Sequence, residues 1–488
     1  MKTKNLGILG KIISRISTTN SALSQVSFVA GGTVVAQILG VLVLPIVSRL
    51  YSPADFGVMA VYSSVIVILS ELSGFRYYLA IPLPKNKKYA EALVFLSLII
   101  QIVFVCVITL VIMFLGEVIF TWFSLDAIIP YKYFIPLGLV FIGIYNILVQ
   151  WSVREGAFNV IGKTKISQSV AGAAAKIGIG FLGFKPIGLL LGTIISQAGG
   201  ITTLFFAAIK KNGFPLFDKN NVYRVALKYR KMPLFSTWYG LINSMGTGLP
   251  QLFLSSLYNL QEAGLFSMAS SLLSIPTNFV GQAMGQVFIQ RASIAKNSNN
   301  ISVISLRAYL LLLRIGFFPI ALISIFAPPL FSFFLGDRWG ASGIYAIALV
   351  PFIAYRFAFS PLSMLYLILD KQESSVVHEL VYLFYRIIGL SLGYFWKSPV
   401  LSVLLYSGFC FLVQFYRVIY LLNVAGNSKT IIIKNTLKII SEAILMLILP
   451  VICLFYNMNL PILMFVVVFV SSIYLYITYK YLSIEGII

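Results

Sequence analysis

The chain has 488 residues, of which 59% are hydrophobic and only 10% are charged. Soluble domains carry roughly 25% charged residues, so the composition excludes a soluble globular protein. The formal net charge of +22 does not indicate a nucleic-acid-binding protein, because the basic residues do not gather on one water-exposed face but lie mostly in short loops between apolar runs.

Long apolar runs predict an all-α integral membrane protein. The run from Ala92 to Leu115 exceeds the roughly 20 residues that a helix needs to cross the hydrocarbon core. The runs do not alternate polar and apolar residues as barrel strands do. Their polar breaks predict about 14 transmembrane helices, at residues 25–48, 57–81, 91–115, 131–152, 166–184, 187–209, 233–256, 264–289, 308–335, 341–369, 376–396, 399–423, 439–456 and 460–479.

The N-terminal residues 1–24 are basic and lack the apolar core and cleavage site of a signal peptide. We expect a cytoplasmic or interfacial segment, with Ile8 to Ile16 as a short amphipathic helix. The three cysteines, Cys106, Cys410 and Cys453, fall inside apolar runs without paired spacing, which predicts buried structural thiols rather than a disulfide or a metal site.

The charge distribution predicts the orientation. Most basic residues outside the spans fall in one set of alternate loops or in the termini, and such loops face the cytoplasm. An even number of helices therefore predicts that both termini are cytoplasmic. Every loop on the other side is short, which leaves no room for an external domain.

The two halves of the chain repeat each other. The segment "SRLYSPADFG" from Ser48 to Gly57 returns as "SSLYNLQEAG" from Ser255 to Gly264. Parallel six-helix repeats pack about an axis along the membrane normal, with the substrate between them. The repeat predicts an N-lobe, a basic cytoplasmic linker attracted to anionic headgroups, a C-lobe and two further helices, at 25–209, 210–232, 233–423 and 424–488.

The first copy of the repeat predicts a helix hairpin. Pro53 and its polar neighbours stop the first helix, and Gly57 permits a tight turn. Asp55 would complement the dipole at the start of the second helix. The glycines and alanines from Val170 to Gly180 predict close packing of the fifth helix.

Several basic residues lie inside the predicted spans. Lys176, Arg356 and Arg386 fall near mid-span, and Arg76 follows Glu71 in the second helix. Such residues normally face a protein interior or a wet cavity, and the planar fork of arginine suits phosphate oxygens. We predict that Lys176, Arg356, Arg386 and Arg76 line a cavity that binds a diphosphate headgroup.

Each of these residues has an alternative interpretation. Arg76 could snorkel to the interface, and its spacing from Glu71 does not favour a helical ion pair. Arg356 or Arg386 could form a structural pair with Glu379. Arg314 and Arg417 are expected to snorkel.

Ion coupling usually needs an acid in the membrane, for which Glu71 and then Glu379 are the candidates. His378, the only histidine, begins a predicted helix, where a solvated surface role is expected. The segment "IGKT" from Ile161 to Thr164 lacks the earlier glycine of a phosphate loop. Asp126 and Asp337 stand alone, so we expect no enzyme, no cofactor and no metal.

The segments "SRLYSPADFGVMAVYSS" and "FRYYLAIPLPK", the latter from Phe75 to Lys85, resemble the start of polysaccharide-biosynthesis membrane proteins. These are Wzx-type flippases of O-antigen (lipopolysaccharide) or capsule units, in the multidrug/oligosaccharidyl-lipid/polysaccharide exporter (MOP) superfamily. The match is specific over roughly the first ninety residues.

The resemblance implies a V-shaped, two-lobed transporter in the bacterial inner membrane. It would move an undecaprenyl-diphosphate-linked oligosaccharide to the outer leaflet by alternating access. Implied partners are the lipid bilayer, a polysaccharide polymerase and a chain-length regulator, with the transporter itself monomeric. The alternative is a cation-coupled multidrug antiporter of the same superfamily, which would favour acidic rather than basic residues in its cavity.

Overall fold

A computed structural model describes residues 21–212, 218–297, 301–456 and 458–484. The amphipathic helix predicted at Ile8 to Ile16 lies outside these residues, as does part of the linker predicted at 210–232. Over the described residues the regular structure is helical, without strands. The all-α fold class predicted from the sequence is thus confirmed.

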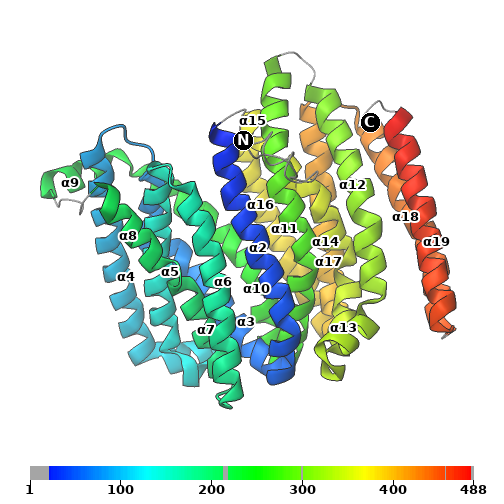
Figure 1. Ribbon diagram of the computed structural model, residues 1–488, viewed down its shortest axis with the longest axis horizontal. Coiled ribbons are helices and arrows are strands. Elements are labelled where there is room, and N and C mark those ends of the chain that lie inside the picture. Colours follow the sequence, from blue (N-terminus) through cyan, green and yellow to red (C-terminus); the bar gives the residue numbers. More distant parts are fainter. Residues whose placement is uncertain (1–20, 213–217, 298–300, 457, 485–488) are drawn as a thin grey trace, which may run out of the picture. The chain divides into compact units, whose positions relative to one another are not determined.

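The chain divides into two compact units, residues 1–248 and 249–488, which we call unit 1 and unit 2. The division falls inside α10 (Thr237–Leu257), because the first half of this helix contacts α3 through Ser244 and Gly248. Unit 1 contains α2 (Ser21–Leu50), α3 (Pro53–Leu72), η1 (Ser73–Ala80), α4 (Lys87–Trp122), η2 (Asp126–Tyr131), α5 (Phe134–Arg154), α6 (Phe158–Phe181), α7 (Ile187–Ala198), α8 (Ile201–Asn212), α9 (Lys219–Lys228) and η3 (Met232–Ser236), coloured blue to green in Figure 1.

Unit 2 begins with the second half of α10 and contains two more helices after its main bundle (Figure 1). Its elements are α11 (Leu260–Asn297), α12 (Ile301–Ile325), α13 (Ala327–Leu335), η4 (Asp337–Trp339), α14 (Gly340–Leu362), α15 (Leu365–Ile368), α16 (Gln372–Phe395), α17 (Pro399–Val424), α18 (Lys429–Phe455) and α19 (Leu460–Ile484).

Each of the 14 predicted helices has a counterpart among the described helices. Eleven segments are long and apolar enough to cross a membrane by length and composition. The remaining three, α6, α10 and α11, are long helices with more polar sequences. Lipid does not tolerate exposed polar groups, so these three helices are the ones expected to need protein or water beside them.

The hairpin between α2 and α3 has Asp55 in the first turn of the second helix, as predicted. The tight turn predicted at Gly57 was wrong, because α3 already begins at Pro53 and Gly57 lies inside it. Ser52 and Asp55 form a capping box, in which the Ser52 backbone N–H donates to Asp55 Oδ2 at 2.8 Å. The preceding Tyr51 hydroxyl donates to the Lys176 carbonyl at 2.7 Å, and a Cβ at Gly180 or Gly188 would collide with its ring or hydroxyl. Tyr51 therefore holds the α6–α7 pair, which confirms close packing along the glycine-rich segment.

The second copy of the repeat makes an equivalent contact in unit 2. The Tyr258 hydroxyl lies 2.6 Å from Ser402 Oγ on α17, and its ring meets that of Tyr394 on α16 edge to face. In both units the tyrosine of the repeat motif thus contacts a pair of adjacent helices. The tyrosine that the two copies of the repeat share therefore has the same packing role in each unit.

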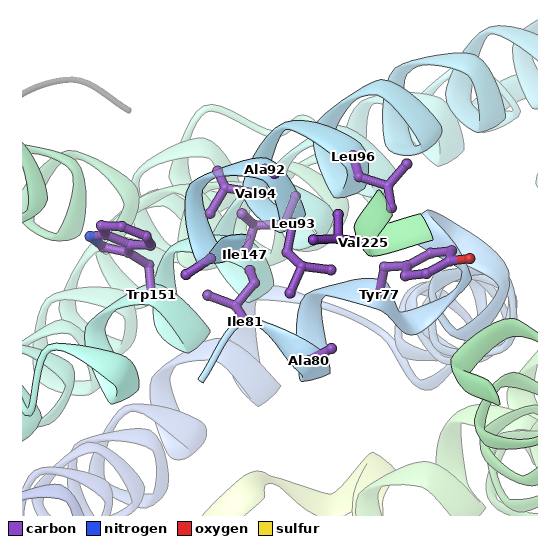
Figure 2. Packing of buried hydrophobic residues seen from close by; sticks show 11 residues of the cluster. Tyr77, Ala80, Ile81, Ala92, Leu93, Val94, Leu96, Ile147, Trp151 and Val225 are labelled. Atoms are coloured by element: carbon purple, nitrogen blue, oxygen red, sulfur yellow. The ribbon is translucent and has the colours of Figure 1, made fainter. Parts of the chain in front are cut away.

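The apolar core of unit 1 reaches the end of α4 where basic residues gather. Figure 2 shows Leu93 and Leu96 of α4 packed with Tyr77 of η1, Trp151 of α5 and Val225 of α9.

Sequence analysis predicted that all three cysteines are buried; Cys410 and Cys453 are, but Cys106 on α4 is exposed. An apolar run places Cys106 in a helix but does not fix which face of that helix it occupies, because successive residues differ by about 100° around the axis.

The core of unit 2 is built around α14, which packs against α11, α12 and α17. The Tyr309 hydroxyl lies 2.8 Å from both the Tyr355 hydroxyl and Thr436 Oγ1. These three buried side chains attach α18 to α12 and α14, since each comes from a different helix. On α19, the Tyr474 hydroxyl donates to the Arg314 carbonyl of α12 at 2.9 Å, so both helices after the repeat are integrated into unit 2.

Candidate functional site

Glu71 and Arg76 form an ion pair in unit 1. The sequence predicts a continuous helix over 57–81, but α3 ends at Leu72 and is followed by left-handed backbone at Gly74, Phe75 and Arg76, with φ of 64°, 44° and 55°. Gly74 enters this conformation without a Cβ penalty. The turn brings Arg76 Nε to 3.3 Å from Glu71 Oε2. The expectation against pairing was wrong because it assumed helical spacing.

The ion pair is held by the start of α10. Ser244 Oγ donates to Glu71 Oε1 at 3.0 Å, and Arg76 Nη1 donates to the Ser236 carbonyl at 2.8 Å. A Cβ at Gly240 would collide with both charged groups. The predicted headgroup cation Arg76 and the predicted coupling acid Glu71 therefore satisfy each other, which leaves this cluster close to neutral.

Lys176 lies on α6, apart from that pair. Because α6 begins at Phe158 rather than at residue 166, Lys176 is five residues from the end of the helix, or about 8 Å, and the mid-span placement was wrong. Its side chain lies so close to Gly192 on α7 that a Cβ there would collide with it. Within the described residues no carboxylate forms an ion pair with Lys176.

Arg356 on α14 and Arg386 on α16 belong to one group of side chains in unit 2. The Arg386 guanidinium carbon lies 3.9 Å from the centroid of the Tyr382 ring, and the side chain is only 4% exposed. Arg356 is partly exposed and lies 5.7 Å from the Phe352 ring. Both arginines lie close enough to Tyr382 and Tyr406 for their charges to act on these side chains.

Cys410 completes this group, because it lies against Arg386, Tyr382 and Tyr406. We call Arg356, Arg386, Tyr382, Tyr406 and Cys410 the arginine–tyrosine cluster. No carboxylate among the described residues forms an ion pair with either arginine. The cluster therefore carries two positive charges whose immediate partners are aromatic rings and a thiol, and its net charge suits an anion.

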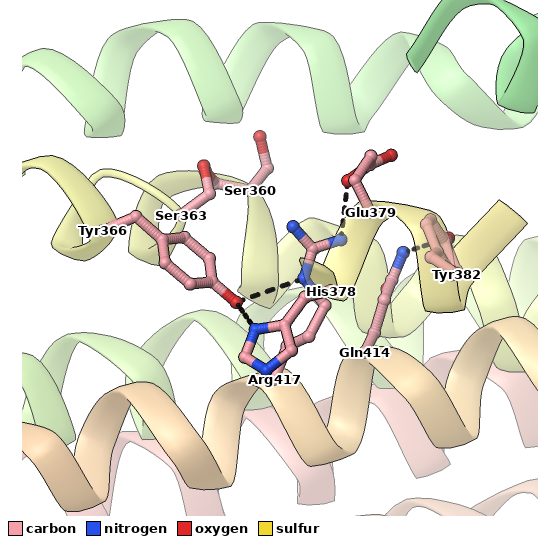
Figure 3. A network of polar contacts seen from close by, with 8 residues as sticks. All are labelled: Ser360, Ser363, Tyr366, His378, Glu379, Tyr382, Gln414 and Arg417. Atoms are coloured by element: carbon pink, nitrogen blue, oxygen red, sulfur yellow. Dashed lines mark hydrogen bonds and ion pairs between the residues drawn. The ribbon is translucent and has the colours of Figure 1, made fainter. Parts of the chain in front are cut away.

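Glu379 pairs with Arg417 rather than with Arg356 or Arg386. Figure 3 shows Arg417 Nη1 donating to Glu379 Oε2 at 3.0 Å and its Nε donating to the Tyr366 hydroxyl at 3.4 Å. Arg417 is 5% exposed and Glu379 is 7% exposed. The expectations that Arg417 snorkels and that Glu379 pairs with Arg356 or Arg386 were wrong, because Arg417 faces α16 from inside the bundle.

His378 joins the same network. Its Nδ1 lies 2.7 Å from the Tyr366 hydroxyl, and its ring meets that of Tyr420 at 4.8 Å. The side chain is buried, so the solvated role expected from its place at a helix start was wrong. We call Tyr366, His378, Glu379 and Arg417 the Tyr366 network, and its one arginine is balanced by one carboxylate.

Arg314 on α12 also has a carboxylate partner. Its Nη2 lies 2.9 Å from Glu442 Oε2 on α18, and its guanidinium carbon lies 4.6 Å from the Tyr481 ring. The expected snorkelling was wrong because α12 begins at Ile301, which puts Arg314 13 residues, about 20 Å, into the helix. Sequence analysis did not single out Glu442, although an acid inside an apolar run was the available signal.

Over the residues that the structure describes, no group of three or more histidine, cysteine, aspartate or glutamate side chains could hold a metal ion. The predicted site residues are arranged as arginine–carboxylate pairs, the arginine–tyrosine cluster and Lys176.

The chain is similar in sequence to one protein family and in fold to several solved structures. The sequence matches the family described as polysaccharide biosynthesis protein over residues 46–343. A search of curated proteins finds no match.

Among solved structures, the lipid II flippase MurJ in an inward closed conformation matches with a TM-score of 0.70 and 16% identity, covering 92% of this chain and 98% of that chain. The MATE transporter VcmN of Vibrio cholerae matches with a TM-score of 0.57 and 14% identity, over 85% and 97%. An inward-facing multidrug resistance MATE family transporter of the MOP superfamily matches with a TM-score of 0.51 and 17% identity, over 84% and 97%. At these identities the likeness establishes the fold.

Proposed function

The chain belongs to the polysaccharide biosynthesis protein family, and from this membership we propose that it is a flippase for an undecaprenyl-diphosphate-linked oligosaccharide. The substrate would be a repeat unit of an O-antigen, a capsule or an exopolysaccharide. It would pass from the cytoplasmic to the outer leaflet by alternating access. The fold supports the proposal, since it is shared with a lipid II flippase and with MATE transporters.

The observation that carries the proposal is the arginine–tyrosine cluster. A diphosphate that enters a membrane protein needs cations to replace its hydration, and arginine offers planar, multiple hydrogen bonds to phosphate oxygens. Arg356 is the partly exposed member and would contact the headgroup, whereas the buried Arg386 would add positive potential. Lys176 is the corresponding cation of unit 1, and we assign Arg76 to its pair with Glu71.

Orientation is part of the proposal. We place both termini in the cytoplasm of a bacterial cell, with the protein in the cytoplasmic membrane as a monomer that hands its product to a polymerase and a chain-length regulator. The distribution of basic loops supports this orientation. Exposed aromatic residues lie at the helix ends away from the basic loops and fit the aromatic belt of a membrane interface. Examples are Trp122 and Phe123 at the end of α4 and Phe395 and Trp396 at the end of α16.

The test is transport of a fluorescent undecaprenyl-diphosphate oligosaccharide in liposomes that contain the full-length protein. Wild type is compared with Arg356→Ala and Arg386→Ala at matched reconstitution levels. The control is Arg338→Ala, which removes an exposed arginine in η4. Because hydrogen bonds to charged groups contribute about 1.5–3 kcal/mol, Arg356→Ala should lose roughly 10–100-fold in transport. Arg386→Ala should also lose transport, because it removes the buried positive charge, and the control should retain it.

The alternative function is a cation-coupled multidrug antiporter, which the MATE-like fold equally permits. Its cavity would need an available acid, yet Glu71 and Glu379 are both paired with arginines. Exchange of a cationic dye by the wild type, without transport of the lipid-linked sugar, would establish the antiporter and end the flippase proposal.

A further inference from the structure

The short helix α9 is capped at its start and anchored to unit 1 along one face. Asp218 caps its first turn by accepting from the backbone N–H groups of Asn220 and Asn221. Val225 is fully buried, and the Tyr77 hydroxyl donates to the Ala226 carbonyl at 3.1 Å. One face of α9 is thus fixed to α4 and η1, which leaves the opposite face to be explained.

The opposite face of α9 combines apolar and basic side chains. Tyr223 and Leu227, one turn apart and so on the same side of the helix, are 68% and 53% exposed. Lys219 flanks them on one side and Arg224 and Lys228 on the other, all exposed. An apolar stripe with basic flanks is the pattern of a helix that lies in a membrane interface.

The position of α9 identifies what can cover this face. Val225 packs with Leu93, Val94 and Leu96, which are the first apolar turns of the span formed by α4, as Figure 2 shows for Val225, Leu93 and Leu96. Lys228 lies 5.6 Å from the ring of Tyr89 in the same helix. The apolar run of α4 begins at Ala92, beside α9, so a bilayer that covers this run would place α9 at the depth of the lipid headgroups.

More basic residues surround this position. Lys85, Lys87 and Lys88 precede or begin α4, and Arg230 and Lys231 follow α9, all with exposed side chains. Juxtamembrane basic residues each contribute to attraction by anionic headgroups, and the attraction falls off within a Debye length. Charge complementarity therefore favours anionic lipid over a neutral lipid surface.

We propose that the outer face of α9, with Tyr223 and Leu227 inserted among the acyl chains and Lys219, Arg224, Lys228 and Arg230 on phosphate groups, is a docking surface for anionic phospholipid headgroups. The inference does not depend on which substrate the protein transports. Because the inner face of α9 contacts η1, lipid docking would also stabilise the turn that carries Arg76.

Hydrogen–deuterium exchange of the full-length protein in nanodiscs tests this surface. Backbone exchange over residues 219–231 is compared in pure phosphatidylcholine and in phosphatidylcholine mixed with phosphatidylglycerol. Each basic residue near an anionic surface adds about 1 kcal/mol, or about fivefold. The triple variant Arg224→Gln, Lys228→Gln, Arg230→Gln should therefore lose on the order of 100-fold of the protection that phosphatidylglycerol adds.

A matched control removes three exposed lysines from another helix end, as Lys429→Gln, Lys434→Gln, Lys438→Gln on α18. This control should keep the lipid-dependent protection of residues 219–231. Equal exchange in the two lipid compositions for the wild type would overturn the proposal. So would equal loss in the control variant, since the effect would then reflect net charge rather than α9. Transport activity enters neither readout.

Discussion

Unit 2 holds two arginines in one helix pair with opposite surroundings. Arg417 on α17 lies against Glu379 on α16, with Tyr366 as a second hydrogen-bond partner. Seven residues further along α16, about 10 Å, Arg386 lies over the ring of Tyr382 without a carboxylate ion pair among the described residues. The same side chain is thus neutralised at one level of the bundle and left cationic at the next.

Arg417 and Arg386 differ in the net charge that they leave inside the bundle. A buried pair such as Arg417–Glu379 adds no net charge, so it can join helices but offers little to an anion. A cation–π contact contributes about 2 kcal/mol when desolvated and leaves the full positive charge in place. A cation in a membrane span costs at least about 2.5–3.5 kcal/mol, so the contact with Tyr382 offsets only part of that cost, as the proposed role in headgroup binding requires.

The largest expected effect comes from breaking the neutral pair. Glu379→Gln leaves Arg417 buried without its counter-charge, which should destabilise the protein by about 3–5 kcal/mol. The midpoint of thermal unfolding in detergent, followed by tryptophan fluorescence, measures this loss.

A double variant sharpens the result. In Glu379→Met, Arg417→Met both charges are replaced together, and the buried pair can be exchanged for apolar contacts at little cost. The double variant should therefore be more stable than Glu379→Gln alone. A double variant at least as unstable as Glu379→Gln would show that the carboxylate acts through something other than its pairing with Arg417.

The pair Arg314–Glu442 provides a second neutral pair with a more exposed carboxylate. The Glu442 side chain is 25% exposed, against 9% for Glu379, so solvent screens part of the loss. Glu442→Gln should cost roughly 2 kcal/mol in the same unfolding assay, below the broken-pair range. Because α18 and α12 meet at this pair, we also expect a protease to cleave the Glu442→Gln variant at sites nearer to α18 than those cleaved in wild type.

The sequence predicts what depends on neighbours along the chain. The helices follow from runs of apolar residues, and the capping box at Ser52 and Asp55 follows from short-range spacing. The pairing of charges does not, because it depends on which helix face meets which neighbour. Arg417 and Glu379 come from separate helices, and nothing local to either residue indicates the other.

Two other misplacements have local causes that the sequence also conceals. Arg76 reaches Glu71 only because three consecutive residues take left-handed backbone, and two of them, Phe75 and Arg76, are residue types that rarely do so. Arg314 lies deep in α12 because that helix begins at Ile301, in a stretch where serine and arginine suggested a loop. Residue types at the candidate site were thus predictable, whereas their partners were not.

Arg386→Lys tests the arginine that, in the comparison with Arg417, has no carboxylate partner among the described residues. Lysine keeps the charge but lacks the planar group that stacks on Tyr382, so the charge would no longer be held in the same place. We expect transport to fall about tenfold, or about 1.4 kcal/mol, with little change in unfolding midpoint. Tyr382→Leu, which removes the ring and keeps the arginine, separates stacking from charge: transport that survives this change but not Arg386→Gln assigns the effect to charge.

The smallest expected effect comes from Glu71→Gln. The Glu71–Arg76 pair is more exposed than Arg417–Glu379 but Arg76, unlike Arg386, has a carboxylate partner among the described residues. Glu71 and Arg76 are 20% and 19% exposed, so the loss of the ion pair should cost about 1 kcal/mol or less, in line with Ser244→Ala, which removes one hydrogen bond to the same carboxylate. If the pair is structural, both variants transport at near wild-type rates with and without a pH gradient. Abolition of gradient-dependent transport by Glu71→Gln but not by Ser244→Ala would instead make Glu71 a coupling acid, because only the first variant removes the titratable group.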